Sequence, residues 1–322
     1  MLAILLWFLA LLALAVLGVA AWFVVTTRRI ARHAESRIPM IGKKLTVGGD
    51  SIRYVEQGEG PPILFIHGLG GQLHHFDRTL FPSIAYGYRL VAIDRAGSGY
   101  STRRASGPRL PEQADLIARF IDELGLGKPL VVGHSLGGAI SLTLAMRHPG
   151  KVAGLALIAP LTHYVPAPPE AFGGLYIKSP LLRRVIAETI AIPTSLKHAR
   201  ATLDLVFAPQ KPTEDYAYAG GGYLGLRPSH FHAVSSDLVA VEQDLPAIQA
   251  RYGELKMPVG ILFGDADRIL DHKAQGLAMQ GRIEGIEIEI LEGIGHMPQF
   301  VVADRVAAFV RRMAARAFTP AE

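Results

Sequence analysis

The sequence feature that most constrains the fold is a Gly-x-Ser-x-Gly motif centred on Ser135, which lies between an apolar run and a helical segment. Leu130–Val132 predicts a buried strand, and Ala139–Met146 predicts a helix soon after it. A strand that turns this sharply into a helix strains the backbone at its tip, so small residues must flank the tip. Gly133 and Gly137 meet this requirement, and a glycine-rich helix start is the competing interpretation. The pattern therefore predicts a serine hydroxyl that is lifted out of the sheet.

A serine hydroxyl becomes a nucleophile when a histidine takes its proton and a carboxylate orients that histidine. Candidates for both groups follow two apolar strands predicted in the C-terminal third. Asp265 and Asp267 come directly after Val259–Phe263, and His296 follows Ile286–Leu291. Because the carboxyl ends of parallel strands meet at one edge of a sheet, we expect the serine, one of the aspartates and the histidine to meet there.

These motifs, and the chain order serine, aspartate, histidine, resemble the α/β-hydrolase superfamily from about Lys44 to Phe309. The resemblance implies an α/β fold with a mostly parallel sheet, helices on both of its faces and a helical cap insertion. It also implies an oxyanion hole made by two backbone N–H groups. The matching donors are Leu136, which follows the serine, and Leu69, in the His-Gly loop after the predicted strand Pro62–Ile66.

The same resemblance indicates which residues complete a catalytic triad. In the superfamily the acid usually occupies a Gly-x-x-Asp pattern, which selects Asp267 and leaves Asp265 as the open alternative. The Gly-His-Met-Pro setting of His296 resembles the histidine loop of the superfamily. His134, inside the serine turn, is expected to pack beneath that turn instead of acting as a base. We therefore expect a triad of Ser135 with Asp267 and His296.

The N-terminus carries a second signal, because the 24 residues of Leu2–Val25 include no charged or strongly polar side chain. As a helix this segment would extend about 36 Å, which exceeds the roughly 30 Å hydrocarbon thickness of a bilayer. It therefore predicts a slightly tilted transmembrane helix. A cleaved signal peptide is the alternative, but such peptides have a basic start and a shorter apolar core, and Met1–Ile4 holds no basic side chain.

The distribution of charge bears on orientation and on partners. Basic residues follow the apolar segment and none precedes it: Arg28, Arg29, Arg32, Arg37, Lys43 and Lys44. The positive-inside rule then predicts a cytoplasmic catalytic domain, with the basic cluster close to anionic lipid head groups. The net charge of +5 comes without a nucleic-acid-binding motif or a basic stripe interleaved with aromatic residues, so no nucleic-acid partner is expected. The lack of cysteine excludes disulfides and thiol catalysis.

The sequence predicts one globular domain after the anchor, interrupted by a single insertion. Residues 1–27 are expected to form the anchor and 28–43 a basic juxtamembrane linker. An α/β-hydrolase core is expected in two parts, 44–160 and 256–318. Between them, 161–255 is expected to form a cap of several short helices, because apolar residues at helical spacing are interrupted by prolines and by three consecutive glycines.

Together these features predict a serine hydrolase that cleaves carboxylic esters through an acyl-enzyme. The anchor, the basic stretch and the apolar cap favour a lipid-like acyl ester, and the arrangement resembles the membrane-anchored monoacylglycerol lipases, including the run Asp267–Asp271. Carbon–carbon bond hydrolases and perhydrolases with the same triad are alternatives, as is a non-catalytic ligand-sensing module. No cofactor or metal is expected, because the histidines at 74–75 and 230–232 lack a third ligand at metal-site spacing. The acyl length, the alcohol and the oligomeric state stay open.

Overall fold

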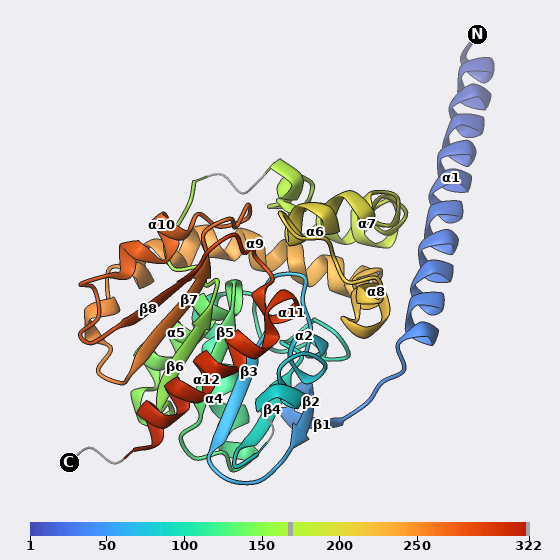
Figure 1. Cartoon of the computed structure of the whole chain (residues 1–322). Helices are drawn as coiled ribbons and strands as arrows, with labels where there is room; N and C mark the ends of the chain where they lie inside the picture. Colours follow the sequence, from blue (N-terminus) through green and yellow to red (C-terminus); the bar gives the residue numbers. More distant parts are fainter. Residues whose placement is uncertain (85, 167–169, 320–322) are drawn as a thin grey trace.

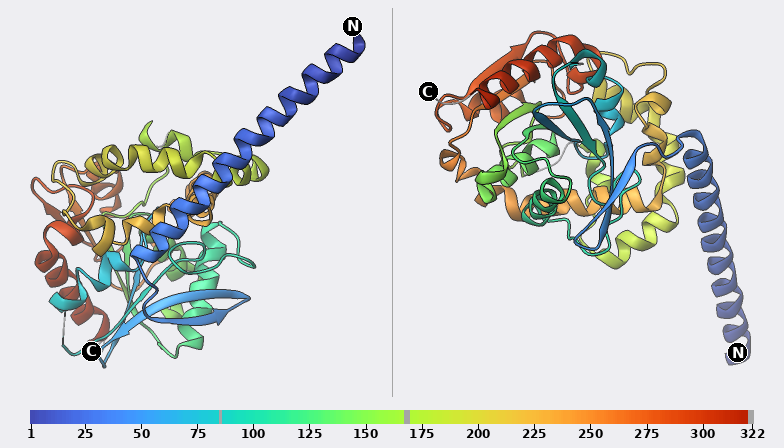
Figure 2. Two further views of the ribbon diagram at one scale, coloured as in Figure 1. Left: turned by 90° about the vertical axis from the view of Figure 1, so that its right-hand side faces the viewer. Right: turned by 90° about the horizontal axis from the view of Figure 1, so that it is seen from below.

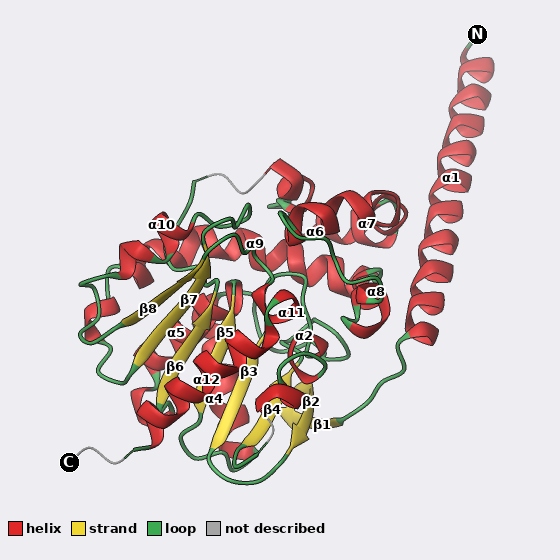
Figure 3. Cartoon of the chain, in the orientation of Figure 1, coloured by secondary structure: helices red, strands yellow, loops and turns green. Residues whose placement is uncertain are grey.

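The structure of the chain is a computed structural model that describes residues 1–84, 86–166 and 170–319. Within these residues the centre is an eight-stranded sheet with the order β1-β2-β4-β3-β5-β6-β7-β8 (Figures 1 and 3). The strands are β1 (Lys43–Val47), β2 (Asp50–Gln57), β3 (Pro62–Ile66), β4 (Arg89–Ile93), β5 (Leu130–His134), β6 (Gly154–Ile158), β7 (Val259–Gly264) and β8 (Glu287–Leu291).

The sheet is mostly parallel. β2 pairs antiparallel with β1 and β4, whereas the neighbouring strands from β4 to β8 pair parallel. The central strands β5 and β6 are buried at every position, which explains why their sequences are continuous apolar runs without alternation. The predicted α/β-hydrolase sheet is confirmed.

Helices cover both faces of the sheet (Figure 1). On β3, Leu64 and Ile66 pack into the cluster under α4 (Leu110–Glu123) and α5 (Leu136–Arg147). Ile63 and Phe65 point to the opposite face and pack under α3 (Phe81–Ile84) and α12 (Ala303–Phe318), because successive side chains of a strand alternate between faces. The remaining short helices of the core are α2 (His74–Asp77), α10 (His272–Gln275), α11 (Pro298–Val301) and the 3-10 turns Pro149–Lys151, Tyr252–Glu254 and Leu277–Met279.

A helical layer lies above the edge where the parallel strands end (Figures 1 and 3). It is formed between β6 and β7, within the segment predicted to be a cap. Its helices are α6 (Pro180–Glu188), α7 (Ala191–Phe207), α8 (Tyr216–Ala219) and α9 (Pro228–Gln249), with 3-10 turns at Glu170–Leu175 and Gly222–Gly225. Local signals start two of these helices: the Ser179 hydroxyl accepts from Leu182 N at the start of α6, and proline occupies the first position of α6 and α9.

The N-terminal helix α1 (Leu2–Arg37) extends beyond the rest of the chain over its apolar part (Figures 1 and 2). By length and composition it is the one helix among the described residues that could cross a membrane, and its most apolar window is fully exposed. The predicted helix is therefore present, and the structure gives it twelve further residues beyond Val25.

The helix α1 continues past residue 28, where the sequence predicts that a linker begins. This part of the helix contacts the cap. Thr27 is buried and its hydroxyl donates to Thr189 O (2.5 Å), and Glu35 forms an ion pair with Arg227 (3.2 Å). The arginine-rich segment has good intrinsic helix propensity, and these tertiary contacts hold it in that conformation.

Candidate active site

Ser135 lies at the sharp turn between β5 and α5. Its backbone has φ 53° and ψ −120°, a region that residues with a side chain rarely occupy. A methyl group on Gly133 would lie 2.5 Å from Ser141 Oγ, and one on Gly137 would overlap the carbonyl oxygen of Ile66. The strained serine and its two small neighbours thus have the geometry that the motif predicts.

His296 and Asp267 form a buried pair. The Nδ1 of His296 donates to Asp267 Oδ2 (2.7 Å), and the Asp267 side chain is fully buried. The other carboxylate oxygen accepts from the backbone N–H groups of Ile269 (2.7 Å) and Leu270 (3.0 Å). With both oxygens occupied, the carboxylate has one orientation, and the imidazole that it holds keeps Nε2 free to act as a base.

Asp265, the alternative acid, has a different environment. It is exposed, and its Oδ1 accepts from Gly293 N (2.7 Å) in the loop that carries His296. The structure therefore places Asp267 against the imidazole and Asp265 against the backbone of the adjoining loop.

His134 connects the serine turn to the histidine loop. Its Nε2 donates to the carbonyl oxygen of His296 (2.9 Å), and the two imidazole centroids lie 5.0 Å apart. Burial, and then the neighbouring His296, hold the pKa of His134 well below its usual range, so this ring is neutral. Among the described residues Ser135 Oγ and His296 Nε2 make no hydrogen bond.

The two predicted oxyanion donors flank Ser135. Leu136 is the first residue of α5, so its N–H has no partner within the helix. Gly68, whose peptide carries the Leu69 N–H, lies so close to the serine that a methyl group on it would be 2.9 Å from Ser135 Cβ. Neither N–H has an acceptor within the part of the chain that the structure describes. Both remain available to an oxygen bound beside the serine.

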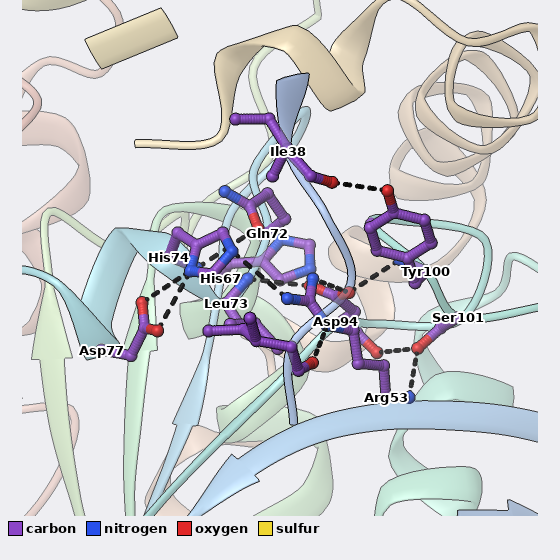
Figure 4. Close-up of polar contacts among 12 residues, drawn as sticks. Ile38, Arg53, His67, Gln72, Leu73, His74, Asp77, Asp94, Tyr100 and Ser101 are labelled. Atoms are coloured by element: carbon purple, nitrogen blue, oxygen red, sulfur yellow. Dashed lines mark hydrogen bonds and ion pairs between the residues drawn. The ribbon is translucent and has the colours of Figure 1, made fainter. Parts of the chain in front are cut away.

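A buried ion pair joins the strand β2 to the loop after β4 (Figure 4). Arg53 Nη1 donates to Asp94 Oδ2 (3.1 Å), with both side chains fully buried. Asp94 also accepts from Leu73 N (2.9 Å) and Tyr100 N (2.8 Å), and Tyr100 OH donates to Ile38 O (2.6 Å) directly after α1. The loop after β4 therefore fixes the residue that follows the His-Gly loop and the end of the N-terminal helix to the core.

The cap contacts both loops of the site. Gln72 Nε2 donates to Gly220 O (2.6 Å), and Tyr216 OH bonds His75 Nε2 (3.1 Å). On the other side Gln210 bridges the backbone of the His296 loop, by donating to Gly293 O (2.6 Å) and accepting from Gly295 N (3.0 Å). These contacts hold cap segments directly over the loops that carry the predicted site residues.

Three of the histidines at 74–75 and 230–232 are buried: His74, His75 and His230. Burial lowers the pKa of His75 to about 3 and that of His230 to about 4, so both rings are neutral. His74 contacts Asp77 (2.9 Å) and Arg53 (3.2 Å). Among the described residues no group of three or more His, Cys, Asp or Glu side chains is placed to hold a metal ion.

Sequence reasoning missed a buried cluster of charged residues between the core and the cap. Arg95, which follows Asp94, forms an ion pair with Asp237 of α9 (2.7 Å), and Arg103 pairs with the same carboxylate (2.7 Å). One signal was present: Asp237 stands three residues after Val234 and four before Val241, so a helix places this charge beside apolar residues.

The chain belongs to the family of alpha/beta hydrolase fold proteins, whose family model matches residues 61–302. Its first curated relatives share only one segment with it. The dihydrolipoyllysine-residue acetyltransferase component of the acetoin cleaving system from Cupriavidus necator is 41% identical over 116 residues, and the chain spans about a third of the length of that relative.

Two further relatives match over most of their length. A 2-hydroxy-6-oxononadienedioate/2-hydroxy-6-oxononatrienedioate hydrolase from Klebsiella pneumoniae is 27% identical over 79% of this chain and 87% of its own. Lipase 1 from Psychrobacter immobilis is 26% identical over 88% of this chain and 86% of its own. The crystal structure of a membrane phospholipase A, a bacterial virulence factor, superposes with a TM-score of 0.68 at 26% identity, covering 99% of this chain and 100% of the other. These similarities support hydrolytic activity.

Proposed function

We propose that this protein is a serine hydrolase that cleaves carboxylic esters of lipid-like acyl groups through an acyl-enzyme. The observation that carries the proposal is the buried His296–Asp267 pair (2.7 Å), whose loop is bonded through the His296 carbonyl to His134 (2.9 Å), the residue directly before the strained Ser135. A serine, a histidine and a buried carboxylate at the ends of parallel strands are the groups that nucleophilic acyl transfer requires.

In the proposed reaction His296 Nε2 accepts the hydroxyl proton as Ser135 Oγ attacks the ester carbonyl. Asp267 stabilises the imidazolium that results. The N–H groups of Leu69 and Leu136 bind the oxyanion of the tetrahedral intermediate. His296 then donates the proton to the departing alcohol, which leaves the acyl group on the serine. A water molecule deprotonated by His296 attacks the acyl-enzyme and releases the acid.

The surface of the cap supports a lipid-like substrate. Large apolar side chains are exposed on α6 and at the start of α7: Leu181, Leu182, Val185, Ile190 and Leu196. The helices α6 and α7 lie on the side of the molecule toward which α1 extends (Figure 1). An exposed apolar surface of this kind indicates contact with a membrane or a partner, and its place beside an apolar helix favours the membrane.

The position at which α1 contacts the cap also supports a cap that faces the membrane. Thr27, two residues after the apolar segment ends at Val25, bonds to Thr189 between α6 and α7. At 1.5 Å per residue, the cap contact lies about 3 Å along the helix from the apolar segment. We therefore propose that α1 is a single-pass anchor, that the cap lies at the membrane surface, and that the catalytic domain is cytoplasmic, as the basic residues after the anchor indicate.

A chain-length series of substrates tests the proposed activity. We expect the detergent-solubilised protein to hydrolyse acyl esters and monoacylglycerols, with kcat/KM rising with acyl length, because each further buried methylene contributes about 0.8 kcal/mol of binding. Release of the free acid is the measurement. A protein that hydrolyses only acetyl or butyryl esters would contradict the lipid assignment and leave the esterase assignment intact.

The similarity to the Klebsiella pneumoniae hydrolase makes a carbon–carbon bond hydrolase the second candidate. Such an enzyme can use the same serine, histidine and aspartate on a dienoate whose carbon–carbon bond breaks. Loss of the absorbance of a vinylogous 2-hydroxy-6-oxo-dienoate distinguishes the two. Turnover of that compound with a kcat/KM above that of every ester in the series would favour this second function.

Removing residues 2–25 is expected to yield a protein that stays soluble without detergent and still turns over short esters. The truncation leaves Thr27 and its cap contact in place, so the catalytic domain should keep its fold. Fractionation of cells and ester turnover by the soluble fraction are the measurements. Loss of activity in a truncated protein with an unchanged unfolding temperature would contradict a role limited to anchoring. Orientation has a separate test: digestion of the full-length protein by a protease added outside intact cells would contradict the cytoplasmic orientation.

A further inference from the structure

Arg95, in the loop after β4, is buried and uses every nitrogen of its side chain. Its Nε donates to His67 O (3.0 Å), its Nη2 to Gly68 O (3.1 Å), and its Nη1 to Gln113 Oε1 and Asp237 Oδ2 (both 2.7 Å). A buried guanidinium requires such partners, because its charge cannot be neutralised by losing a proton. Two of these partners are consecutive carbonyl groups of the His-Gly loop.

The Gly68 carbonyl determines where the neighbouring donor points. It accepts from Arg95 Nη2 and also from His67 Nδ1 (2.8 Å). The peptide bond that joins Gly68 to Leu69 is trans and planar, so the Leu69 N–H points opposite to the Gly68 C=O. Holding that carbonyl toward Arg95 therefore holds the Leu69 N–H away from Arg95, on a peptide that lies directly against Ser135.

His67 contributes to the same arrangement from within the loop. Its Nε2 accepts from the backbone N–H of Arg95 (2.9 Å), while its Nδ1 donates to Gly68 O. Burial, and then the charge of Arg95, hold the pKa of His67 well below its usual range. A neutral ring can accept at one nitrogen and donate at the other, as both contacts require.

The carboxylate that pairs with Arg95 comes from the cap. Asp237 lies on α9, 142 positions away in sequence, and its side chain is 1% exposed. Its second oxygen pairs with Arg103 Nη1 (2.7 Å). The position of Arg95 therefore depends on α9 being packed against the core.

We infer that Arg95 is a positioning residue for the oxyanion hole, and that Asp237 makes the geometry of that hole depend on the cap. The inference rests on the proposed function, because an oxyanion forms only if Ser135 attacks a carbonyl. In this arrangement a displaced α9 leaves Arg95 without its counterion, and the two loop carbonyls lose the donor that fixes them. The oxyanion hole is then fully formed only while α9 of the cap is packed against the core.

Two substitutions test the inference in the full-length, detergent-solubilised protein. In Arg95→Lys a single ammonium cannot reach both loop carbonyls and Asp237, and in Asp237→Asn the charge that holds the guanidinium is lost. For each variant we expect kcat for a short ester to fall about 10²-fold, the effect of a small misplacement of a catalytic group, with KM unchanged. Rates are taken per active site, counted by exhaustive labelling with a fluorophosphonate, so unfolded protein does not enter the result.

A transition-state analogue separates positioning from general stability. A trifluoromethyl ketone forms a hemiketal with the serine, and its oxyanion occupies the hole. Its inhibition constant should rise by the same factor by which kcat/KM falls, because the two interactions are made with the same N–H groups. If a substitution only destabilised the fold, the unfolding temperature would fall, and the inhibition constant and kcat/KM would not change by the same factor.

Asp244→Asn is the matched control. Asp244 lies on the same helix and accepts from Arg109 Nε (2.7 Å) and from Leu110 N (2.9 Å), away from the His-Gly loop. It should keep kcat and ketone affinity near those of the unmodified protein. Equal losses in Asp244→Asn and Asp237→Asn, or an Arg95→Lys variant with unchanged kcat and ketone affinity, would overturn the inference. If the unmodified protein neither hydrolyses esters nor labels, the proposed function fails instead.

Discussion

Replacing Ser135 by alanine is expected to lower ester turnover by about 10⁴-fold or more, because the acyl-enzyme can no longer form. The turn should survive the change, since the side chain is small and the alanine methyl fits where the serine Cβ lies. Labelling by a fluorophosphonate probe, followed by gel fluorescence, should disappear together with turnover. The two readouts together assign the nucleophile, because the probe forms its bond with the attacking oxygen itself.

Ser98→Ala is the control for this substitution. Ser98 is also a buried serine between two glycines, in the loop after β4, and its hydroxyl has no hydrogen-bond partner among the described residues. The variant should label as the unmodified protein does. Labelling that persists in Ser135→Ala would show that a residue other than Ser135 is the nucleophile. A folded, unmodified protein that never labels and never hydrolyses esters would favour the ligand-sensing alternative.

Asp267→Asn is expected to lower kcat by about 10⁴-fold with little change in the fold. The amide oxygen can still accept from Ile269 N and Leu270 N, but the amide NH₂ group then faces His296 Nδ1. A donor at that position favours the tautomer with the proton on Nε2, which cannot accept the serine proton. The measurement is kcat for a short ester, with the unfolding temperature recorded alongside.

Asp265→Asn is the matched comparison at the other aspartate of the same loop. Its amide oxygen can still accept from Gly293 N, so we expect activity close to that of the unmodified protein. The reverse ranking of the two variants would assign the acid to Asp265. Similar small losses in both would indicate that His296 is oriented by something other than a carboxylate.

The parts of the site that the sequence predicts are those determined by short stretches of chain. The turn at Ser135 follows from an apolar strand, two glycines and a helix within a few residues, and β5 and α5 have nearly the predicted bounds. Asp267 and His296 each follow a strand, and parallel strands end at a common edge whatever the connecting segments do. Local patterns therefore suffice to place them.

The contacts between the cap and the core could not be predicted in the same way. The Arg95–Asp237 pair depends on the packing of α9, and residues 142 positions apart carry no local signal of their contact. The same is true of α1. Its apolar run ends at Val25, and the helix continues because Thr27 contacts Thr189 and Glu35 contacts Arg227. The basic residues there lead to the prediction of a juxtamembrane linker, whereas the structure continues the helix to Arg37.

The unbroken course of α1 has a mechanical consequence. No glycine or proline interrupts the helix between Val25 and Arg37, so this stretch has no residue at which the axis bends readily. A helix that spans a bilayer changes its tilt with bilayer thickness. Since α1 is fastened to the cap through Thr27, a change of tilt in the proposed anchor would act directly on α6 and α7, and lipid composition would then affect how these helices pack on the core.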